Sequence, residues 1–484
     1  MSNQSTDLGK DSIGKLMFKL SAPAIIAQIV NVLYNIVDRI FIGRMANGDL
    51  AMAGVGVAFP IILLISAFSA LAGMGGAPLA AIKMGEDDED YAEKIMANSF
   101  SLLIIIAIIL TSVFLLFKEP ILIAFGASEK TLSYGIDYIS IYLLGTIFVQ
   151  IALGMNSYIN TQGFAKIGMM TVAIGALINI VLDPILIFGL NLGVKGAALA
   201  TLTAQAVSAA WVLKFLFGNK SILKIRKKNL KLDKKIILSI VGLGMAPFIM
   251  QSTESLVLIS LNTQLSKYGG DLAVGAMTIM SSIMQMILLP MTGLTQGAQP
   301  IISYNYGAKN INRVKKTFKL CLISSLIYSA AAWLLLMTSS EVVVKIFNND
   351  PSLLQITSNS IKIYFAGIFI FGAQISCQQT FLSLGKAKIS LFLALLRKII
   401  LLIPLIFILP MFVDNGLFAV LLAEPVADVI AALTTVACFT VFYKKTLSKI
   451  NINENNKSIA HFLIHIHTYK RLQSTKENYK TKQM

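Results

Sequence analysis

Five carboxylates interrupt apolar stretches of the chain, and they are the side chains best suited to do chemistry: Asp38, Asp183, Glu254, Glu424 and Asp428. At the centre of a bilayer an ionised side chain costs about 2.5 to 3.5 kcal/mol on insertion scales. Acids that bear this cost usually face a cavity or an opposite charge, where they can bind a proton or another cation. We therefore expect all five to point into the protein interior.

The first acid lies on a polar helix face. Gln28, Asn31, Asn35 and Asp38 recur at intervals of three, four and three residues, which places them on one side of an α-helix. The neighbouring Arg39 points elsewhere and cannot pair with Asp38 along the helix. This face is predicted to look inward and to contact a substrate.

The second acid is followed by a proline. Asn179 and Asp183 are i,i+4 neighbours, and Pro184 removes a backbone donor from its turn. A loosened turn beside a carboxylate also exposes carbonyl oxygens, a combination that suits a bare cation or a proton. The alternative is that Asp183 caps a kink and bonds only to nearby amides.

The remaining acids belong to two later segments. Gln251 and Glu254 share a face at i,i+3, and Glu424 and Asp428 share one at i,i+4 around Pro425. Glu254 is predicted to bind substrate or ion, together with Gln251. Two interpretations stay open for the Glu424 and Asp428 pair: a second functional acid pair, or a structural pairing with Arg397 or Lys398.

Composition defines the elements that must position these side chains. The 484 residues are 56% hydrophobic and only 13% charged, far from the roughly 25% charged residues of soluble domains. Since a bilayer crossing needs roughly 20 apolar residues, we predict an all-α membrane protein. Its spans are 16–43, 51–82, 95–117, 131–160, 167–190, 194–217, 236–266, 272–304, 316–338, 352–384, 389–413 and 416–443.

The two halves of the chain repeat one unit. An offset of 222 residues aligns Gly48-Asp49-Leu50-Ala51 with Gly270-Asp271-Leu272-Ala273, and also Gly85 with Gly307. The predicted domains are a cytoplasmic N-terminus (1–15), a six-helix bundle (16–217), a basic cytoplasmic linker acting as a hinge (218–235), a second bundle (236–443) and a disordered tail (444–484). Six spans per unit make the repeats parallel, as in transporters that rock two bundles about a central site.

Charge distribution predicts the topology. The linker carries eight cations, and the loop after residue 308 and the tail are also rich in Lys and Arg. By the positive-inside rule both termini are cytoplasmic. This topology accounts for the net charge of +17 without nucleic acid. All three histidines lie in the tail, so none is available in the membrane to relay protons.

Motifs of other protein classes are missing. The sequence contains no GxxxxGK[ST], HExxH or GxSxG and no Cys/His zinc spacing, so we predict no enzyme activity, no cofactor and no firm metal site. Gly73-Met74-Gly75-Gly76 sits in an apolar span and is typical of close helix packing. The acidic run Glu86–Asp90 is expected to be a solvated loop that interacts with nearby basic loops.

Several short motifs resemble the multidrug and toxic compound extrusion (MATE) family, particularly its MepA-type bacterial branch. They are Ala22-Pro23 to Asp38-Arg39, Phe41-Ile42-Gly43, Leu182-Asp183-Pro184, Lys195-Gly196-Ala197-Ala198 to Thr201, and Pro425-Val426-Ala427-Asp428. The resemblance covers roughly residues 16 to 445. It implies a V-shaped pair of six-helix bundles, working as a monomer, that expels bulky cationic drugs in exchange for protons or sodium ions.

The resemblance also implies roles for individual residues. Asp38 and Asp183, with Asn156, Asn179 and Thr201, match a polar cluster that binds the coupling cation. Glu254 matches a carboxylate used by sodium-coupled relatives in the C-terminal bundle. Those relatives carry a further acid on the tenth span, where this chain has only Gln374, Cys377, Gln378 and Gln379. A C-terminal sodium site is therefore not expected here.

The main hypothesis is a secondary-active antiporter that exports lipophilic cations and confers drug resistance. The first alternative is a flippase for lipid-linked sugars or other amphipathic precursors, which would need inward-facing Arg and Lys. A membrane-embedded transferase would need a nucleophile or an acid/base set at one interface, and none is visible. A passive channel is disfavoured by the duplicated bundle.

Overall fold

The computed structural model describes residues 7–348 and 350–447. These residues form helices, turns and loops, and no strand occurs among them. They belong to two compact units, Met1–Thr435 and Val436–Met484. All candidate site residues lie in the first unit. The predicted disordered tail falls outside the described residues, except for its start in the π-helical turn Tyr443–Leu447.

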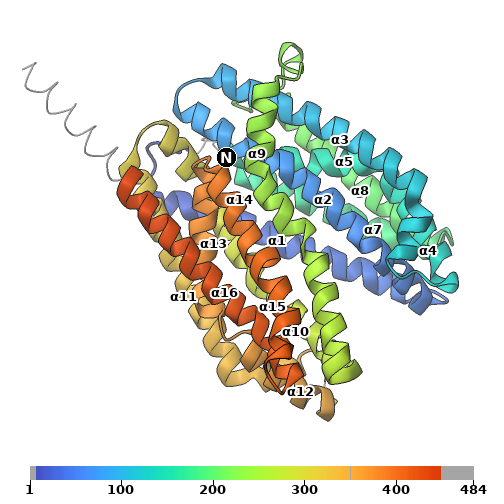
Figure 1. Cartoon of the computed structure of the whole chain (residues 1–484). Coiled ribbons are helices and arrows are strands. Elements are labelled where there is room, and N and C mark those ends of the chain that lie inside the picture. The colour runs from blue at the N-terminus through green and yellow to red at the C-terminus, as the bar shows by residue number, and fades with distance from the viewer. Residues whose placement is uncertain (1–6, 349, 448–484) are drawn as a thin grey trace, which may run out of the picture. The chain divides into compact units, whose positions relative to one another are not determined.

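The first half of the chain folds into helices that match the first six predicted spans (Figure 1). Two of these spans are irregular: the fourth is bent and contains a π-helical turn, and the fifth ends in another π-helical turn. The helices are α1 (Ile13–Gly43), α2 (Gly48–Gly85), α3 (Glu89–Ala124), α4 (Glu129–Leu144), α5 (Thr146–Gln150), η1 (Ile151–Met155), α6 (Asn156–Thr161), α7 (Ala165–Pro184), η2 (Ile185–Gly189) and α8 (Val194–Leu216).

The second half begins after a short 3₁₀ turn, η3 (Lys227–Asn229), in the linker. Its helices are α9 (Lys234–Ser252), α10 (Glu254–Gly307), α11 (Ile311–Lys345), α12 (Pro351–Tyr364), α13 (Ile368–Ser383), α14 (Ala387–Leu395), η4 (Leu396–Leu402), α15 (Ile403–Ile408), η5 (Leu409–Met411) and α16 (Gly416–Phe442). Two of the predicted spans correspond to bent or interrupted helices here, 352–384 and 389–413.

These helices account for all twelve predicted spans. Within the described residues nine helices are long and apolar enough to cross a membrane, and two bent pairs, α4–α6 and α12–α13, add two more. One of the nine, Lys234–Gly307, has 74 residues, which at 1.5 Å per residue is several times the roughly 30 Å bilayer core. Its backbone turns at Gly270, where φ is 65°, and divides it into two crossings.

Short polar side chains start several of these helices. Asp88 accepts a hydrogen bond from the Tyr91 N–H at the start of α3, and Asp233 does the same for the first turn of α9. Asn310 and Asp350 cap α11 and α12 in the same way. Such caps satisfy backbone donors that have no partner inside the helix, so they fix where each span begins after its loop.

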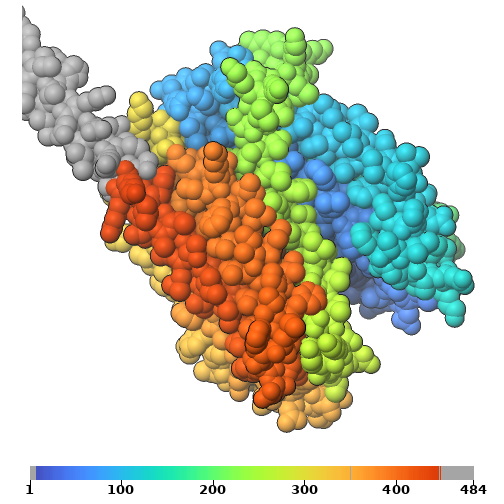
Figure 2. Space-filling view, in the orientation of Figure 1, coloured from blue at the N-terminus to red at the C-terminus, as the bar shows by residue number. Residues whose placement is uncertain are grey.

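Each half has its own apolar core, but α9 crosses the boundary. The core of the second half is built from residues between Val257 and Ala427. Ile236 and Ile240 of α9 instead pack into the core of the first half, with Leu216 and Leu223. Figure 2 shows the surface of this green helix between the blue first half and the orange helices of the second. The end of the linker therefore belongs, by packing, to the first half.

Glycines let the helices of the two halves touch backbone to backbone. A Cβ at Gly75 would overlap the backbone of Ile240 in α9, and one at Gly244 would overlap Leu71 in α2. Gly73 lies equally close to Gly154 within the first half. The prediction that the glycine-rich stretch serves close helix packing is confirmed.

Two polar segments outside the spans, the N-terminal segment and the linker, are anchored to the helices. The polar composition of residues 1–15 predicts disorder, but this segment buries Leu8, whose carbonyl accepts hydrogen bonds from Asn305 Nδ2 (2.9 Å) and Arg313 (3.0 Å). The linker's Ser221 hydroxyl and its Ile222 and Leu223 N–H groups all donate to Gln162 Oε1. Polar composition alone does not register such buried backbone partners.

Candidate functional site

An acidic pair from two helices lies inside the first half. Asp38 comes from α1 and Asp183 from the end of α7, and their exposed fractions are 9% and 0%. The two carboxyl groups lie close enough to influence each other electrostatically. Two ionised carboxylates held close together repel each other, and a proton bound by either one relieves that repulsion. The pair is therefore a natural place to bind a proton.

Asn179 and Thr201 complete this cluster. Asn179 Nδ2 donates to Asp183 Oδ1 at 3.3 Å and to Thr201 Oγ1 at 3.4 Å. Asp38 Oδ1, Asp183 Oδ2 and Asn179 Oδ1 are buried and have no hydrogen-bond donor among the described residues. Buried oxygens of this kind are the ligands that hard cations select. The cluster can thus hold either a proton or a small hard cation.

The backbone beside Asp183 is irregular, as the proline predicted. Helix α7 ends at Pro184, and the chain continues as the π-helical turn Ile185–Gly189, with the Leu190 N–H bonded to the Ile185 carbonyl. Proline removes one helical donor and crowds the preceding turn, and π-helical turns are frequent at functional sites. This local feature fixes where the Asp183 carboxylate lies.

Asn156, which the resemblance grouped with the acids, bonds elsewhere. Its Nδ2 donates to the Gly168 carbonyl at 3.2 Å, and its Oδ1 accepts from Thr171 Oγ1 at 3.2 Å. Asn156 lines the same cavity as Asn179 and Thr201 but belongs to a separate hydrogen-bonded group. The structure therefore brings together four of the five predicted coupling residues.

A polar cavity of about 760 Å³ adjoins this cluster. Both halves line it, and Gln28 of α1 donates to Gln296 of α10 at 3.3 Å across it. Asn31, Asn35 and Gln251 line it as predicted, and Asn35 Nδ2 bonds to the Asn31 carbonyl at 2.6 Å. The sequence analysis missed further amides in the wall, of which the last three recur on α10 at helical spacing: Gln205, Asn262, Gln285, Gln296 and Gln299.

The cavity wall carries little formal charge, and its size suits a bulky ligand. Arg39 is the charged residue among those that line the cavity, and its guanidinium lies 5.2 Å from the centre of the Phe59 ring. Asp38 and Asp183 are not among the lining residues, whereas Asn179, which donates to Asp183, and Thr201, which accepts from Asn179, are. Asp183 therefore lies behind the wall, one hydrogen bond from the cavity, with Asp38 beside it.

The acids of the second half are paired with cations. Arg397 Nε bonds to Asp428 at 2.7 Å and its Nη2 to Glu424 at 2.9 Å, while its guanidinium lies 4.5 Å from the centre of the Phe371 ring. Lys398 pairs with Glu254. The π-helical turn η4 carries both cations. Of the two interpretations left open for Glu424 and Asp428, these contacts favour the structural pairing.

Gln251 and Glu254 lie on either side of a one-residue interruption, Thr253, within the helical segment Lys234–Gly307. The backbone of Thr253 stays in the right-handed helical region, so the i,i+3 spacing still predicts a shared face. Helix α9 ends at Ser252 and α10 begins at Glu254, with Thr253 as the break between them. Gln251 lines the cavity, whereas Glu254 is not among the lining residues.

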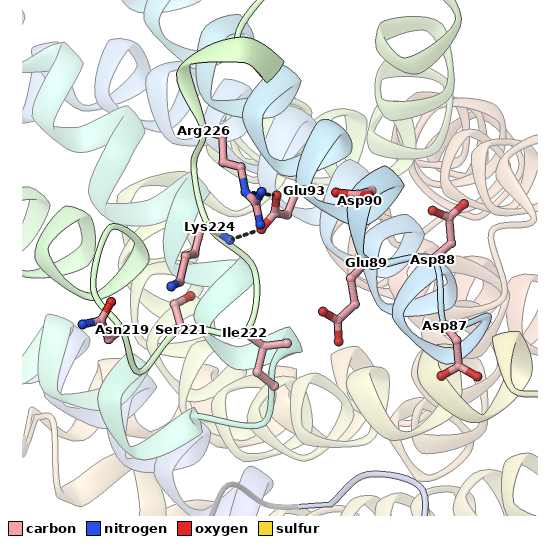
Figure 3. Close-up of a pocket in the computed structure, with 10 residues that line it drawn as sticks. All are labelled: Asp87, Asp88, Glu89, Asp90, Glu93, Asn219, Ser221, Ile222, Lys224 and Arg226. Atoms are coloured by element: carbon pink, nitrogen blue, oxygen red, sulfur yellow. Dashed lines mark hydrogen bonds and ion pairs between the residues drawn. The ribbon is translucent and has the colours of Figure 1, made fainter.

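The acidic run at the start of α3 faces the linker. Figure 3 shows Asp87, Asp88, Glu89, Asp90 and Glu93 around a pocket of about 600 Å³ whose other wall is the linker. Glu93 pairs with Arg226 at 2.7 Å and accepts from the Lys224 N–H at 3.1 Å. Glu93, which follows the acidic run, thus anchors the linker, while the predicted interaction of Glu86–Asp90 with a basic loop stays a prediction.

Two six-span repeats, a polar cavity lined from both, and buried acids next to that cavity define a secondary transporter of the double-bundle class. The model of the MatE family matches residues 23–185 and 247–408, one segment in each repeat. The chain belongs to the MatE family.

Similar proteins fit this assignment. Multidrug export protein MepA of Staphylococcus haemolyticus (strain JCSC1435) is 28% identical over 87% of this chain and 93% of its own length. MepA of Staphylococcus aureus (strain N315) is 26% identical over 88% of this chain and 94% of its own length. A solved MATE structure in the bent conformation has a TM-score of 0.86 at 22% identity, covering 93% of this chain and 99% of that one. A MOP superfamily transporter from Pyrococcus furiosus has a TM-score of 0.85 at 21% identity, with the same coverage.

Proposed function

We propose that this protein is a secondary-active antiporter that exports bulky cationic drugs and other toxic organic compounds in exchange for protons. The observation that carries the proposal is the buried Asp38–Asp183 pair, which lies one hydrogen bond behind the wall of a large polar cavity. The cavity is large enough for a drug-sized molecule. The relatives named as multidrug export proteins support the same substrate class.

Coupling follows from competition for the acidic pair. A proton shared by Asp38 and Asp183 removes their mutual repulsion, whereas the ionised pair attracts a cation in the adjacent cavity. Proton and drug then stabilise different arrangements of the two halves, and such a difference in affinity is all that coupling requires. Sodium is an alternative ion at the same place, with Asn179 and Thr201 supplying neutral oxygens.

Alternating access needs an interface that opens and closes. The halves meet where α1 packs on α10 and α2 packs on α9, with the glycines in closest contact. By the proposed topology, with both termini in the cytoplasm of a bacterium, contacts at Gly85 and Gly307 lie at the inner ends of their helices. In this arrangement the inner side is closed, and the protein works as a monomer that rocks about the cavity.

A flippase for anionic lipid precursors is the less suitable candidate. It would need free cations facing the cavity, but Arg397 is paired with two acids and Lys398 with a third. Only Arg39 among the cavity-lining residues carries positive charge, and it lies over the Phe59 ring. The proposal therefore keeps cations as the substrate class.

Replacing Asp183 tests this function in cells. In a bacterium that lacks its own exporters, Asp183→Asn should abolish efflux of ethidium at equal expression, because the amide cannot take up and release a proton. Asp137→Asn is the matched control, since Asp137 is a half-exposed acid of the same half that pairs with Lys195 at 3.5 Å. Ethidium efflux that survives in the Asp183→Asn variant would remove Asp183 from the mechanism.

A further inference from the structure

Lys398 is a buried cation with an unusual pair of partners. Its side chain is only 8% exposed, and its Nζ bonds to the Glu254 carboxylate and to the Met250 carbonyl, the latter at 2.7 Å. The side chain of Glu254 is 63% exposed. The carboxylate thus contacts Lys398 on its inner side, while much of the Glu254 side chain is exposed at the protein surface.

The two partners of Lys398 lie on opposite sides of a helix break. Met250 is in the last turn of α9, and Glu254 is the first residue of α10. The last carbonyls of a helix have no intrahelical donor, and the ammonium of Lys398 supplies one to Met250. Lys398 therefore bridges the break and holds Glu254 at the same time.

Glu254 is near the cavity although it is not part of its wall. Gln251, three residues before it, and Leu258, four residues after it, both line the cavity. Arg397 cannot replace Lys398, because its guanidinium is committed to Glu424 and Asp428. Two cations thus serve three acids in this cluster, and Lys398 is the cation bonded to Glu254.

We propose that Lys398 is a specificity-determining residue that acts as a tethered cation: it occupies the Glu254 carboxylate from within and keeps small cations and cationic ligands from binding there. The inference rests on the proposed function in one respect only, the assumption that the substrates are lipophilic cations. A free Glu254 next to the cavity would bind lipophilic cations and sodium, since an unpaired carboxylate attracts any cation that reaches it. Lys398 thereby confines cation binding to the acids of the first half.

The test is a binding measurement on the purified full chain in detergent, with tetraphenylphosphonium as the probe. Lys398→Gln keeps a donor for the Met250 carbonyl but removes the charge. It should bind tetraphenylphosphonium about tenfold more tightly than wild type, and sodium should weaken that binding in the variant but not in wild type. The double variant Lys398→Gln/Glu254→Gln should lose both effects. Lys267→Gln, which removes an exposed cation of the same half that lies over the Tyr268 ring, should bind as wild type does.

Equal affinity of wild type and Lys398→Gln, or a gain that persists in the double variant, would overturn the proposal. If Lys398→Gln does not yield folded protein, Glu254→Gln decides the matter alone. That variant leaves the ammonium unpaired beside the cavity, so tetraphenylphosphonium should bind about tenfold more weakly, and unchanged binding would overturn the proposal. Because binding is measured without a gradient, failure of antiport in vesicles would leave this result unaffected.

Discussion

Gly85 and Gly307 occupy equivalent positions in the two repeats, and each lies against the backbone of the other half. A side chain on Gly85 would overlap the carbonyl oxygen of Tyr304, and one on Gly307 would overlap that of Ile82. Tyr304 and Ile82 are themselves equivalent under the same offset. The contact is therefore made twice, related by the internal repeat, and it holds the ends of α2 and α10 together.

Adding one methyl group at this contact should loosen it. Gly85→Ala and Gly307→Ala each place a Cβ against backbone that cannot move aside, and overpacking of this kind costs about 1 to 3 kcal/mol. We expect faster amide hydrogen exchange at residues 80–85 and 303–308 and reduced drug efflux. Gly56→Ala and Gly242→Ala are controls, because no atom lies within 4 Å of a Cβ added there. Unaltered exchange in both test variants would show that the halves do not close at these glycines.

The Arg397 network should be needed for stability. Arg397→Gln leaves Glu424 and Asp428 buried without a counter-charge, which we expect to destabilise the fold by about 3 to 5 kcal/mol. Thermal unfolding of the purified protein would measure the loss, with Arg39→Gln as the control for removal of a guanidinium. Adding Glu424→Gln to Arg397→Gln should recover part of the stability. A variant as stable as wild type would mean that the two acids find other partners.

Gln162 should hold the linker in place. Its Oε1 accepts from the Ser221 hydroxyl and from two backbone N–H groups, and buried donors left unpaired cost about 1 to 3 kcal/mol each. Gln162→Ala should therefore speed tryptic cleavage at Lys224 and Arg226 by at least tenfold. Gln205→Ala, which removes an amide from the cavity wall, should be cleaved at the wild-type rate. Equal cleavage rates for the two variants would contradict the anchoring role.

Drug efflux should depend more on the acids of the first half than on Glu254 of the second half. Asp38→Asn should abolish ethidium efflux, whereas Glu254→Gln should retain part of it, because Glu254 is engaged by Lys398 and has no partner acid on α13. Initial efflux rates at matched expression would measure both. Greater damage in Glu254→Gln than in Asp38→Asn would reverse this order and move the coupling site to the second half.

Much of the fold could be predicted from the sequence, because its signals are local. Span lengths and the amide face of α1 depend on neighbours within a few turns, and the 222-residue repeat is found by comparing the sequence with itself. The sequence also flagged Pro184, and the π-helical turn follows it. The positions of helix interruptions were harder to predict, because neither proline nor glycine adjoins Thr253, where α9 ends.

Which side chains meet across helices could not be read from periodicity. Asp38 and Asp183 come together because α1 packs on α7. Arg397 and Lys398 are both carried by η4, and it is Lys398 that reaches Glu254. The grouping of Asn156 with the acids followed from resemblance, and Asn156 instead bonds to Gly168 and Thr171. The functional roles of these residues stay predictions.

Transport in vesicles tests the central claim most directly. The purified protein would be reconstituted into liposomes, and uptake of a fluorescent lipophilic cation measured with either a pH gradient in sodium-free buffer or a sodium gradient at symmetric pH. The account predicts transport driven by the pH gradient and lost in Asp183→Asn, which cannot exchange a proton. Transport that responds only to the sodium gradient, or that persists in Asp183→Asn, would contradict it.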